Sequence, residues 1–399
     1  MSQIRIATVD LEKWRDEFPI LSRTVYMISN SLGAMPRRAA DRLAEYAGTW
    51  ATRGIRAWED RWWDMPLEIG NRVAGIIGAA AGSVSMHENV TTAQMTALST
   101  IQPAGARRRI VCTAMDFPSM MYLYHGQQAR GLALTVVPAE PDLSVRAERI
   151  VDAIDESTAV VALSHVLFRT SFIVDAAAVV ARAHEVGARV ILDGYQSGGI
   201  VPVDVSRLGV DFFTGGCLKW LCGGPGNAFL YTRPDVLKDA RPSFTGWVSH
   251  RTPFAFDTGA VDARHDAMRM MNGTPAIPAY YAALAGIEII DEVGVDRIRE
   301  ASKTLTARLL ALVDRYGFQS ISTRDPERLA GTVAVNVPDA LAVSRTLKAR
   351  DFLVDYRPAA GIRISPHFYN TIEETERIMA EIAEIVRTKD YAGGDSMVT

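Results

Sequence analysis

The chain has 399 residues, of which 48% are hydrophobic and 22% charged, and its formal net charge is −3. This composition is typical of a soluble globular protein with room for two domains, and so small a charge would attract neither nucleic acid nor an anionic membrane. No apolar signal core or run of about 20 apolar residues occurs, so we expect a cytoplasmic protein without a membrane span. The three cysteines, Cys112, Cys217 and Cys222, fit neither a disulfide framework nor a zinc motif, and no metal is expected.

The middle of the chain alternates strand and helix patterns. A helix is predicted over 174–188, because its apolar residues recur at helical spacing and Gly187 lies near its end. Short apolar runs predict strands at 108–114, 132–139, 158–166, 189–194 and 210–216. Strands separated by helical segments indicate a mainly parallel sheet wrapped by helices, with ligands bound beyond the carboxyl ends of the strands.

The character of the chain changes after Thr274. A long helical stretch covers 278–317, strands are predicted at 331–338 and 361–367, and a helix over 371–388 closes the chain. This order suits a smaller α+β domain. We therefore expect three parts: an N-terminal segment that packs on the small domain, a large α/β domain and the small C-terminal domain, over residues 1–25, 26–277 and 278–399.

Lys219 stands among glycines, cysteines and apolar residues in FTGGCLKWLCGGPG, residues 213–226. The chain has only 6 lysines against 37 arginines, so a solvated positive charge would usually be an arginine here. A lysine differs from an arginine because it can lose its proton and attack a carbonyl carbon as a free amine. We therefore interpret Lys219 as a reactive amine.

Two further signals complement this amine. Asp193 ends the strand RVILD, 26 positions before Lys219; taken alone, it reads as a turn or capping aspartate. Thr91 and Thr92 stand where a loop enters a helix, where they could cap the helix or help its free N–H groups to hold a phosphate. An amine, a carboxylate and an anion site in an α/β framework are what pyridoxal phosphate requires: a Schiff base, a partner for the pyridine nitrogen and a phosphate site.

Several segments resemble motifs of the class V aminotransferase group of fold-type-I pyridoxal-phosphate enzymes, and those of kynureninase most of all. The most specific is LDGYQSGGIVPVDVSRLGVDFFTGGCLKWLCGGPGNAFLY (192–231), similar to that group's acidic residue, G-x-V-P-V-D, G-V-D-F, lysine and G-G-P-G. The others are VYMISNSLGAMP (25–36), WATRGIRAWEDRWW (50–63), SHVLFRTSF (164–172), SFTGW (243–247) and RMMNGTP (269–275). The resemblance implies the fold-type-I α/β architecture, with the cofactor in the large domain.

By that resemblance, four residues would hold the cofactor ring. Lys219 would carry pyridoxal phosphate as the Schiff base, and Asp193 would pair with the pyridine nitrogen. Gln196 would sit beside the O3′ oxygen, where kynureninase has a histidine. Phe117 would stack on the ring, although without the resemblance it reads as a core aromatic.

The resemblance also implies a phosphate site, a substrate site and a homodimer with shared active sites. Arg363 would hold a substrate carboxylate through its bidentate fork, with Asn30 and Ser31 of NSLG at the substrate. From the residues alone, Arg363 could be a structural ion pair and Trp247 a core aromatic. Thr274 would reach the phosphate from the second subunit. The expected phosphate contacts are Thr91, Thr92, Trp247 and Thr274.

Three positions depart from the kynureninase pattern, and all three are expected around the cofactor. Gln196 replaces a histidine, Met120 an acidic residue and Leu218 a tyrosine. Because of these three departures, kynurenine itself is not expected to be the physiological substrate.

The stretch DYRPAAGIRIS has no cysteine before its last arginine, which argues against desulfurase persulfide chemistry.

The expected function is that of an enzyme acting on an α-amino acid or a derivative of one. Our leading hypothesis is a kynureninase-like cleavage at or beyond Cβ, including C–S β-elimination from a cysteine conjugate. The second is amino-group chemistry: transamination, epimerisation or decarboxylative deamination. A catalytically idle binding protein is the alternative of another class, and the retention of Lys219, Asp193 and Arg363 argues against it.

Overall fold

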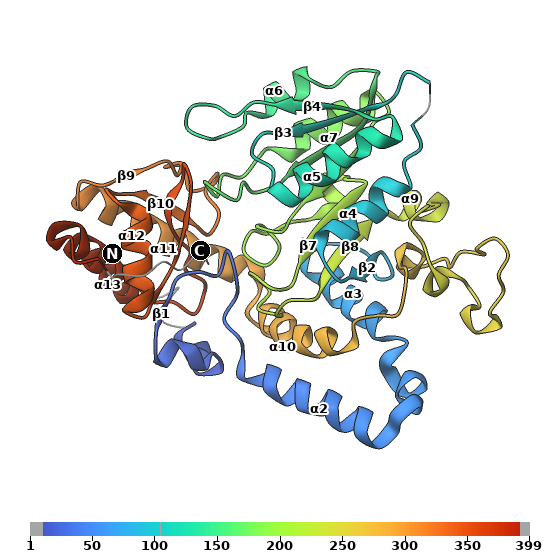
Figure 1. Ribbon diagram of the computed structural model, residues 1–399, viewed down its shortest axis with the longest axis horizontal. Helices are drawn as coiled ribbons and strands as arrows, with labels where there is room; N and C mark the ends of the chain where they lie inside the picture. The colour runs from blue at the N-terminus through green and yellow to red at the C-terminus, as the bar shows by residue number, and fades with distance from the viewer. Residues whose placement is uncertain (1–10, 104, 392–399) are drawn as a thin grey trace.

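The larger part of the molecule is built on a seven-stranded sheet. The structure is a computed structural model that describes residues 11–103 and 105–391. The strand order is β2-β8-β7-β6-β5-β3-β4, in which β8 runs antiparallel to both its neighbours and all other pairs are parallel (Figure 1). The strands are β2 (Val84–His87), β3 (Arg109–Thr113), β4 (Ala133–Val137), β5 (Thr158–Ser164), β6 (Arg189–Asp193), β7 (Phe212–Gly216) and β8 (Ala228–Thr232). The five predicted strands are thus confirmed as β3 to β7.

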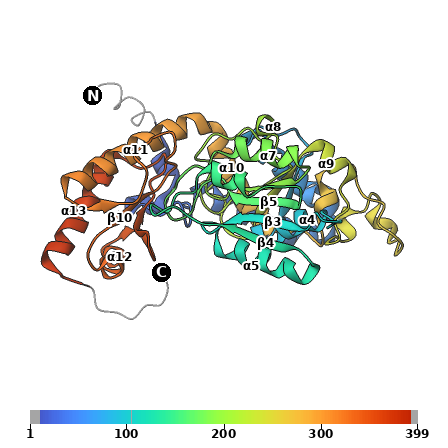
Figure 2. The ribbon, with the colours of Figure 1, turned by 90° about the horizontal axis from the view of Figure 1, so that it is seen from above.

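Helices cover both faces of this sheet, and Figure 2 shows α7 and α8 on one side and α5 on the other. Alternate strand residues feed two separate cores: Val161 and Val190 pack with α7, whereas Val160 and Ile191 pack with α4 and α5. Burial of both faces explains the nearly continuous apolar runs. The helices are α2 (Arg37–Arg53), α3 (Met65–Ile76), α4 (Val90–Ser99), α5 (Pro118–Gly126), α6 (Ala147–Asp152), α7 (Ala176–Glu185), α8 (Val205–Leu208) and α9 (Pro234–Asp239).

A second, smaller unit is built on the antiparallel sheet β12-β13-β10-β9. Its apolar core joins β10 and β13 to the helices α11, α12 and α13 (Figure 1). The strands are β9 (Gln319–Ser320), β10 (Val333–Asn336), β11 (Phe352–Leu353), β12 (Asp355–Arg357) and β13 (Gly361–Ile364). The helices are α11 (Val295–Arg315), α12 (Ala340–Ala349) and α13 (Ile372–Thr388).

The stretch expected to be helical over 278–317 forms two helices, α10 (Ile277–Val293) and α11. They are separated by Gly294, whose φ of +85° is a conformation that favours glycine. Helix α10 packs on α2 and α3 of the larger unit, whereas α11 packs on α13 and β10. The expected division between residues 277 and 278 stays a prediction, and we propose Gly294 as the division because the packing partners change there.

The N-terminal segment contacts both units from residue 11 onward, since Glu17 pairs with Arg38 of α2 at 3.3 Å; residues 1–10 lie outside the described residues. Arg15 forms an ion pair of 2.9 Å with Glu374 of α13, and Phe18 packs on Phe368 and Tyr369. Strand β1 (Val25–Tyr26) then pairs in parallel with β11. None of the described helices is long and apolar enough to cross a membrane.

Candidate active site

Lys219 and Asp193 lie at the same edge of the large sheet. Asp193 is the last residue of β6, and Lys219 follows the end of β7 by three positions. The two strands are parallel neighbours, so their carboxyl ends meet. Both residues line one cavity of about 240 Å³. The full lining is Ser31, Val90, Phe117, Ser164, Val166, Phe168, Asp193, Tyr195, Gln196, Leu218 and Lys219.

The NSLG segment docks on the turn that carries Lys219. Gly33 donates its backbone N–H to the carbonyl of Leu218 at 2.8 Å. A Cβ atom at Gly33 would lie 2.1 Å from the carbonyl oxygen of Lys219, so only glycine permits this approach. The contact places the neighbouring Ser31 at the cavity.

The environment of Lys219 favours a free amine. The pKa of Lys219 is lowered to about 7, chiefly by burial and then by the guanidinium of Arg363, although the carboxylates of Asp193 and Asp355 act in the opposite direction. The Nζ atom lies 4.5 Å from the ring centre of Tyr195 and 5.7 Å from that of Phe117. A large share of the amine is therefore unprotonated near neutral pH and able to act as a nucleophile.

Asp193 is buried, and burial raises its pKa to about 6. The N–H of Tyr195, at 2.8 Å from Oδ1, and the charge of Lys219 lower the pKa in part. A bond from an aspartate side chain to the backbone N–H two residues later is the turn contact that was one interpretation of Asp193. Asp193 also lines the cavity, so it makes the turn contact and is still available to a ligand.

Helix α4, whose N-terminus was expected to bind phosphate, is capped by Asn89, a residue that was not predicted from the sequence. Asn89 is the N-cap of α4 and accepts the backbone N–H of Thr92 at 3.0 Å, so neither threonine is the cap. Thr91 and Thr92 lie in the first turn and are partly exposed, but the cavity is lined by Val90 instead. The end of α4 thus reaches the cavity, and the phosphate contacts of Thr91 and Thr92 stay predictions.

Gln196 lines the cavity and is held on both sides. Its Oε1 accepts from the indole of Trp220 and its Nε2 donates to the carbonyl of Asn30, each at 3.0 Å. The side-chain amide of Asn30 is itself buried, and neither its Nδ2 nor its Oδ1 has a hydrogen-bond partner. Such an unpaired amide is costly and is consistent with a polar ligand close to Asn30.

The aromatic residues divide into two groups. Phe117 lines the cavity, is 40% exposed and meets Phe168 edge-on at 5.3 Å between ring centres, so it is not a core aromatic. Trp247 packs instead on Trp63, Phe254 and Phe256. Neither Trp247 nor the exposed Thr274 lines the cavity of the same chain, so their phosphate contacts stay predictions.

The fork of Arg363 faces a carboxylate of the protein. Its Nε lies 2.8 Å from Oδ1 of Asp355 and its Nη2 lies 2.6 Å from Oδ2, with both side chains almost fully buried. Arg363 therefore forms the structural ion pair that was one interpretation of it. Its Nε and Nη2 atoms are occupied by Asp355, so this pair of donors is not available for the expected two-pronged contact with a substrate. The position of Asp355 was missed by sequence reasoning, although it stands eight residues before Arg363 across a short hairpin.

Of the three departures from the kynureninase pattern, two lie at the cavity and one does not. Gln196 and Leu218 line it, whereas Met120 is buried in the core between the sheet and α5, beside Cys112 and Tyr124. The expectation that Met120 lies by the cofactor rested on its place two residues after Pro118, at the start of α5. The helix turns this side chain towards the sheet.

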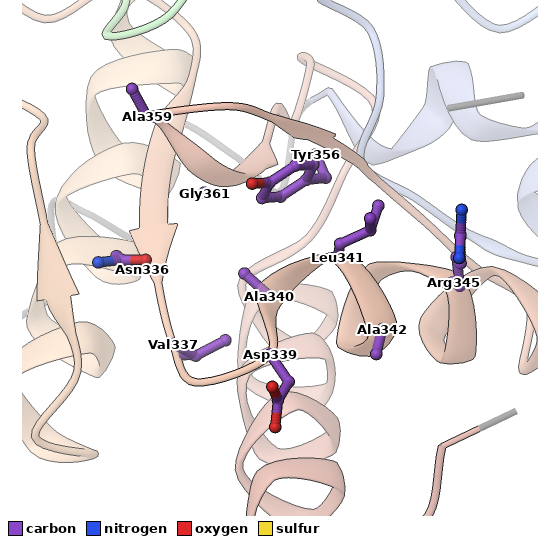
Figure 3. Close-up of a pocket in the computed structure, with 10 residues that line it drawn as sticks. All are labelled: Asn336, Val337, Asp339, Ala340, Leu341, Ala342, Arg345, Tyr356, Ala359 and Gly361. Carbon is purple, nitrogen blue, oxygen red and sulfur yellow. The ribbon is translucent and has the colours of Figure 1, made fainter. Parts of the chain in front are cut away.

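A larger hollow of about 500 Å³ lies on the small unit (Figure 3). It is formed by the end of β10, the start of α12 and the β12–β13 hairpin, with Asp339 and Tyr356 among the side chains drawn. No lysine and no buried carboxylate line it. The chemistry needed for an amine-based reaction is therefore found in the smaller cavity.

The residues of the smaller cavity fit pyridoxal phosphate. Lys219 provides an amine with a lowered pKa, Asp193 a buried carboxylate and Phe117 an aromatic face, all in one enclosure. Gln196 keeps one amide N–H beyond the one that it donates to Asn30. These groups match a covalent anchor, a partner for a protonated ring nitrogen, a stacking surface and a contact for a ring oxygen.

The fold and the cavity together define an enzyme of the fold-type-I pyridoxal-phosphate class. Residues 25–378 match the family model for aminotransferase class V, and the chain belongs to this family of pyridoxal-phosphate-dependent enzymes. It is 30% identical to the kynureninase of Pseudomonas fluorescens over 95% of this chain and 93% of that protein. It is 28% identical to an uncharacterized aminotransferase of Bacillus subtilis over 93% and 97% of the two chains.

Solved structures show the same fold. A mutant of the enzyme C-DES, with glycine covalently linked to its pyridoxal-phosphate cofactor, superposes with a TM-score of 0.85 at 22% identity, covering 95% of this chain and 99% of that one. A cysteine desulfurase of Thermococcus onnurineus superposes with a TM-score of 0.83 at 22% identity, over 94% and 98% of the two chains.

The lowered pKa of Lys219 predicts how the stability of the cofactor-free protein depends on pH. The pKa is about 7 in the folded protein against an ordinary value of 10.5, so between these values the unfolded chain binds the extra proton. The free energy of unfolding should therefore rise with pH across this window. The raised pKa of Asp193 has the opposite effect at lower pH: between its ordinary value of 3.8 and about 6, the free energy of unfolding should fall as the pH rises.

Urea unfolding of the cofactor-free protein at pH 7 and pH 9 measures this effect. Lys219→Met keeps the apolar stem and removes the titrating group, so its stability should change less between the two pH values than that of the wild type. An identical pH dependence in both proteins would show that the amine of Lys219 is not desolvated.

Proposed function

We propose that this protein uses pyridoxal phosphate to act on a free α-amino acid or a derivative, and cleaves a side-chain bond at or beyond Cβ, with C–S β-elimination included. The observation that carries the proposal is that Lys219 and Asp193 line one cavity, with the guanidinium of Arg363 behind it. The similarity to kynureninase over nearly the whole of both chains supports cleavage at the side chain. Val90, Val166, Phe168 and Leu218 give the cavity apolar walls that suit an apolar or aromatic side chain.

Each residue has a defined task in this proposal. When bound, the cofactor would supply an electron-accepting ring. Asp193, buried and charged at neutral pH, would accept a hydrogen bond from the ring nitrogen and keep that nitrogen protonated. Lys219 would provide the covalent anchor and then, as a free amine, would remove the proton at Cα of the substrate. The apolar walls exclude water and so strengthen these charge interactions.

Amino-group chemistry is the second candidate function. The Bacillus subtilis relative is named as an aminotransferase, and the same amine at Cα would serve transamination, epimerisation or decarboxylative deamination. The two candidates differ in the fate of the side chain. Cleavage releases it as a separate product, whereas amino-group chemistry leaves it joined to Cα.

Mass spectrometry of the products tests the proposed function. The purified holoenzyme is incubated with kynurenine, with cysteine S-conjugates and with a panel of amino acids plus pyruvate. C–C cleavage should leave alanine, and C–S cleavage should leave pyruvate, ammonia and the thiol fragment. A product whose side chain is still attached to Cα would contradict the proposal and favour the second candidate; efficient hydrolysis of kynurenine would show that Gln196 and Leu218 do not exclude it.

We also propose a homodimer whose subunits share their active sites; the cytoplasmic location stays a prediction from the sequence. The segment 244–261 exposes several aromatic rings, with Trp247, Phe254 and Phe256 exposed by 39%, 60% and 72%. Clustered aromatic exposure of this kind is typical of an interaction surface. Figure 1 shows this segment projecting from the large unit beyond α9. In such a dimer Thr274 would reach the phosphate of the partner's cofactor.

Sedimentation of the holoenzyme checks the dimer. We expect a dimer, and we expect Phe254→Ser to weaken it by about tenfold or more, because buried aromatic anchors dominate interface energies. Tyr122→Ser, which removes a ring that is 75% exposed on α5, is the matched control. A wild-type monomer with full cofactor occupancy would contradict the shared site.

A further inference from the structure

Asp355 and Arg363 face each other directly across the antiparallel pair β12–β13. Their side chains form a two-pronged ion pair with 2.8 Å and 2.6 Å contacts, and each is about 2% exposed. Asp355 also lies 3.2 Å from the guanidinium of Arg357, and Ser31 donates its hydroxyl to Asp355 at 2.5 Å. Burial alone would raise the pKa of Asp355, but its bonds to Arg363 hold the pKa below the usual range, so this carboxylate is charged.

The donors of Arg363 show which edge faces the cavity. A guanidinium has five N–H groups, and the side edge, formed by Nε and Nη2, is used by Asp355. The end edge, formed by Nη1 and Nη2, meets the carbonyl of Phe168 and the hydroxyl of Ser31, the latter at 3.2 Å. Phe168 and Ser31 both line the cavity, whereas Asp355 does not. Through Phe168 and Ser31, the Nη1 and Nη2 atoms therefore contact residues that line the cavity, and the guanidinium itself is buried directly behind them.

We propose that Asp355 is a positioning residue for substrate binding: it holds Arg363 by the side edge, so that the end edge of Arg363 and the hydroxyl of Ser31 together receive the carboxylate of an amino-acid substrate. The inference rests on the proposed function, because it takes the cavity to be the amino-acid site. Ser31 now donates to Asp355, and rotation of its hydroxyl would direct the same proton to a substrate carboxylate.

The rigidity of the pair explains why Asp355 positions Arg363 rather than competing with the substrate. Asp355 is fixed by the strand register and by three side chains, Arg363, Arg357 and Ser31. Moving it away would leave buried charges without partners, which is costly. Asp355, Ser31 and Phe168 use four of the five N–H groups of Arg363. A substrate carboxylate would therefore use the remaining N–H of Nη1 and the rotated hydroxyl of Ser31, and would leave Asp355 in place.

The test measures binding of L-alanine and of L-alaninamide to the holoenzyme through the change in cofactor absorbance. The two probes differ only in the carboxylate that Arg363 is expected to receive. Asp355→Asn keeps the shape but removes the charge, and we expect it to weaken L-alanine binding by about 10- to 100-fold while the binding of L-alaninamide changes little. The matched control is Asp314→Asn, which breaks an exposed two-pronged pair with Arg324 in the same unit and should change neither affinity.

Asp355→Asn leaves the buried charge of Arg363 without its partner, and this variant alone could fail to fold. A second comparison, in which both charges are removed, keeps the proposal testable in that case. If Asp355 acts only through Arg363, the double variant Asp355→Asn/Arg363→Gln should bind L-alanine as well as Arg363→Gln alone. A further loss in the double variant would overturn the proposal. So would an Asp355→Asn enzyme that binds L-alanine as well as or better than the wild type, or that loses both probes equally.

The wild type separates failure of this inference from failure of the proposed function. A holoenzyme that responds equally to the amino acid and the amide does not read the carboxylate, which overturns the role of Asp355 alone. A holoenzyme that responds to neither probe contradicts the amino-acid site itself, and the proposed function with it.

Discussion

Lys219→Ala is expected to lower kcat/KM by on the order of 10⁴-fold or more, because it removes both the covalent anchor and the base at Cα. The purified wild-type protein should be yellow, and borohydride should attach the cofactor irreversibly to the peptide that contains Lys219. The variant should lose that attachment, while added cofactor can still bind without a covalent bond. Activity with a panel of amino acids and peptide mass mapping measure the two effects.

Lys238→Ala is the control, since Lys238 is an exposed lysine of α9 away from the cavity. It should retain both activity and labelling. Label found on any of the other five lysines, Lys13, Lys238, Lys303, Lys348 or Lys389, would refute the assignment of the site.

Asp193→Asn is expected to lower kcat by about 10²- to 10³-fold, the usual cost of removing one preorganised charge at a reacting centre. The amide keeps the shape of the carboxylate and its contact with the N–H of Tyr195, so the loss would report the charge. Without it, the ring nitrogen is no longer held in its protonated form. The absorbance of the bound cofactor should change with the variant, which a purely structural role would not produce.

Asp204→Asn is the matched control for this charge. Asp204 is exposed and caps α8 by accepting the N–H of Arg207 at 2.8 Å, a task that asparagine performs equally well. Its kcat and its spectrum should stay at the wild-type values. An Asp193→Asn enzyme with wild-type kcat would show that the ring nitrogen has another partner.

The sequence allowed much of the large sheet to be predicted. Strands β3 to β7 are apolar runs bounded by turn residues, and their alternation with helices implies parallel pairing. Strands β2 and β8 were not predicted, and β8 pairs antiparallel with both neighbours. A buried strand is apolar whether it runs parallel or antiparallel to its neighbours, so its composition does not reveal its direction in the sheet.

The reactive pair could be predicted because its chemistry is local. Lys219 stands out as an amine in a chain that prefers arginine, and Asp193 stands out as the carboxylate that ends a buried strand. Both follow parallel strands, and parallel strands bring their carboxyl ends together whatever else the chain does. The chain itself therefore determined the reactive groups, the sheet edge at which they meet and the family.

Only the tertiary structure decided what each group faces. The cap of α4 is Asn89 rather than a threonine, Met120 turns into the core, and the side edge of Arg363 is held by Asp355. These outcomes depend on helix rotation and on strand register, in which a shift of one residue moves a side chain to the opposite face. The sequence alone determined which groups are available for chemistry, and packing decided which of them face the cavity and along which edge.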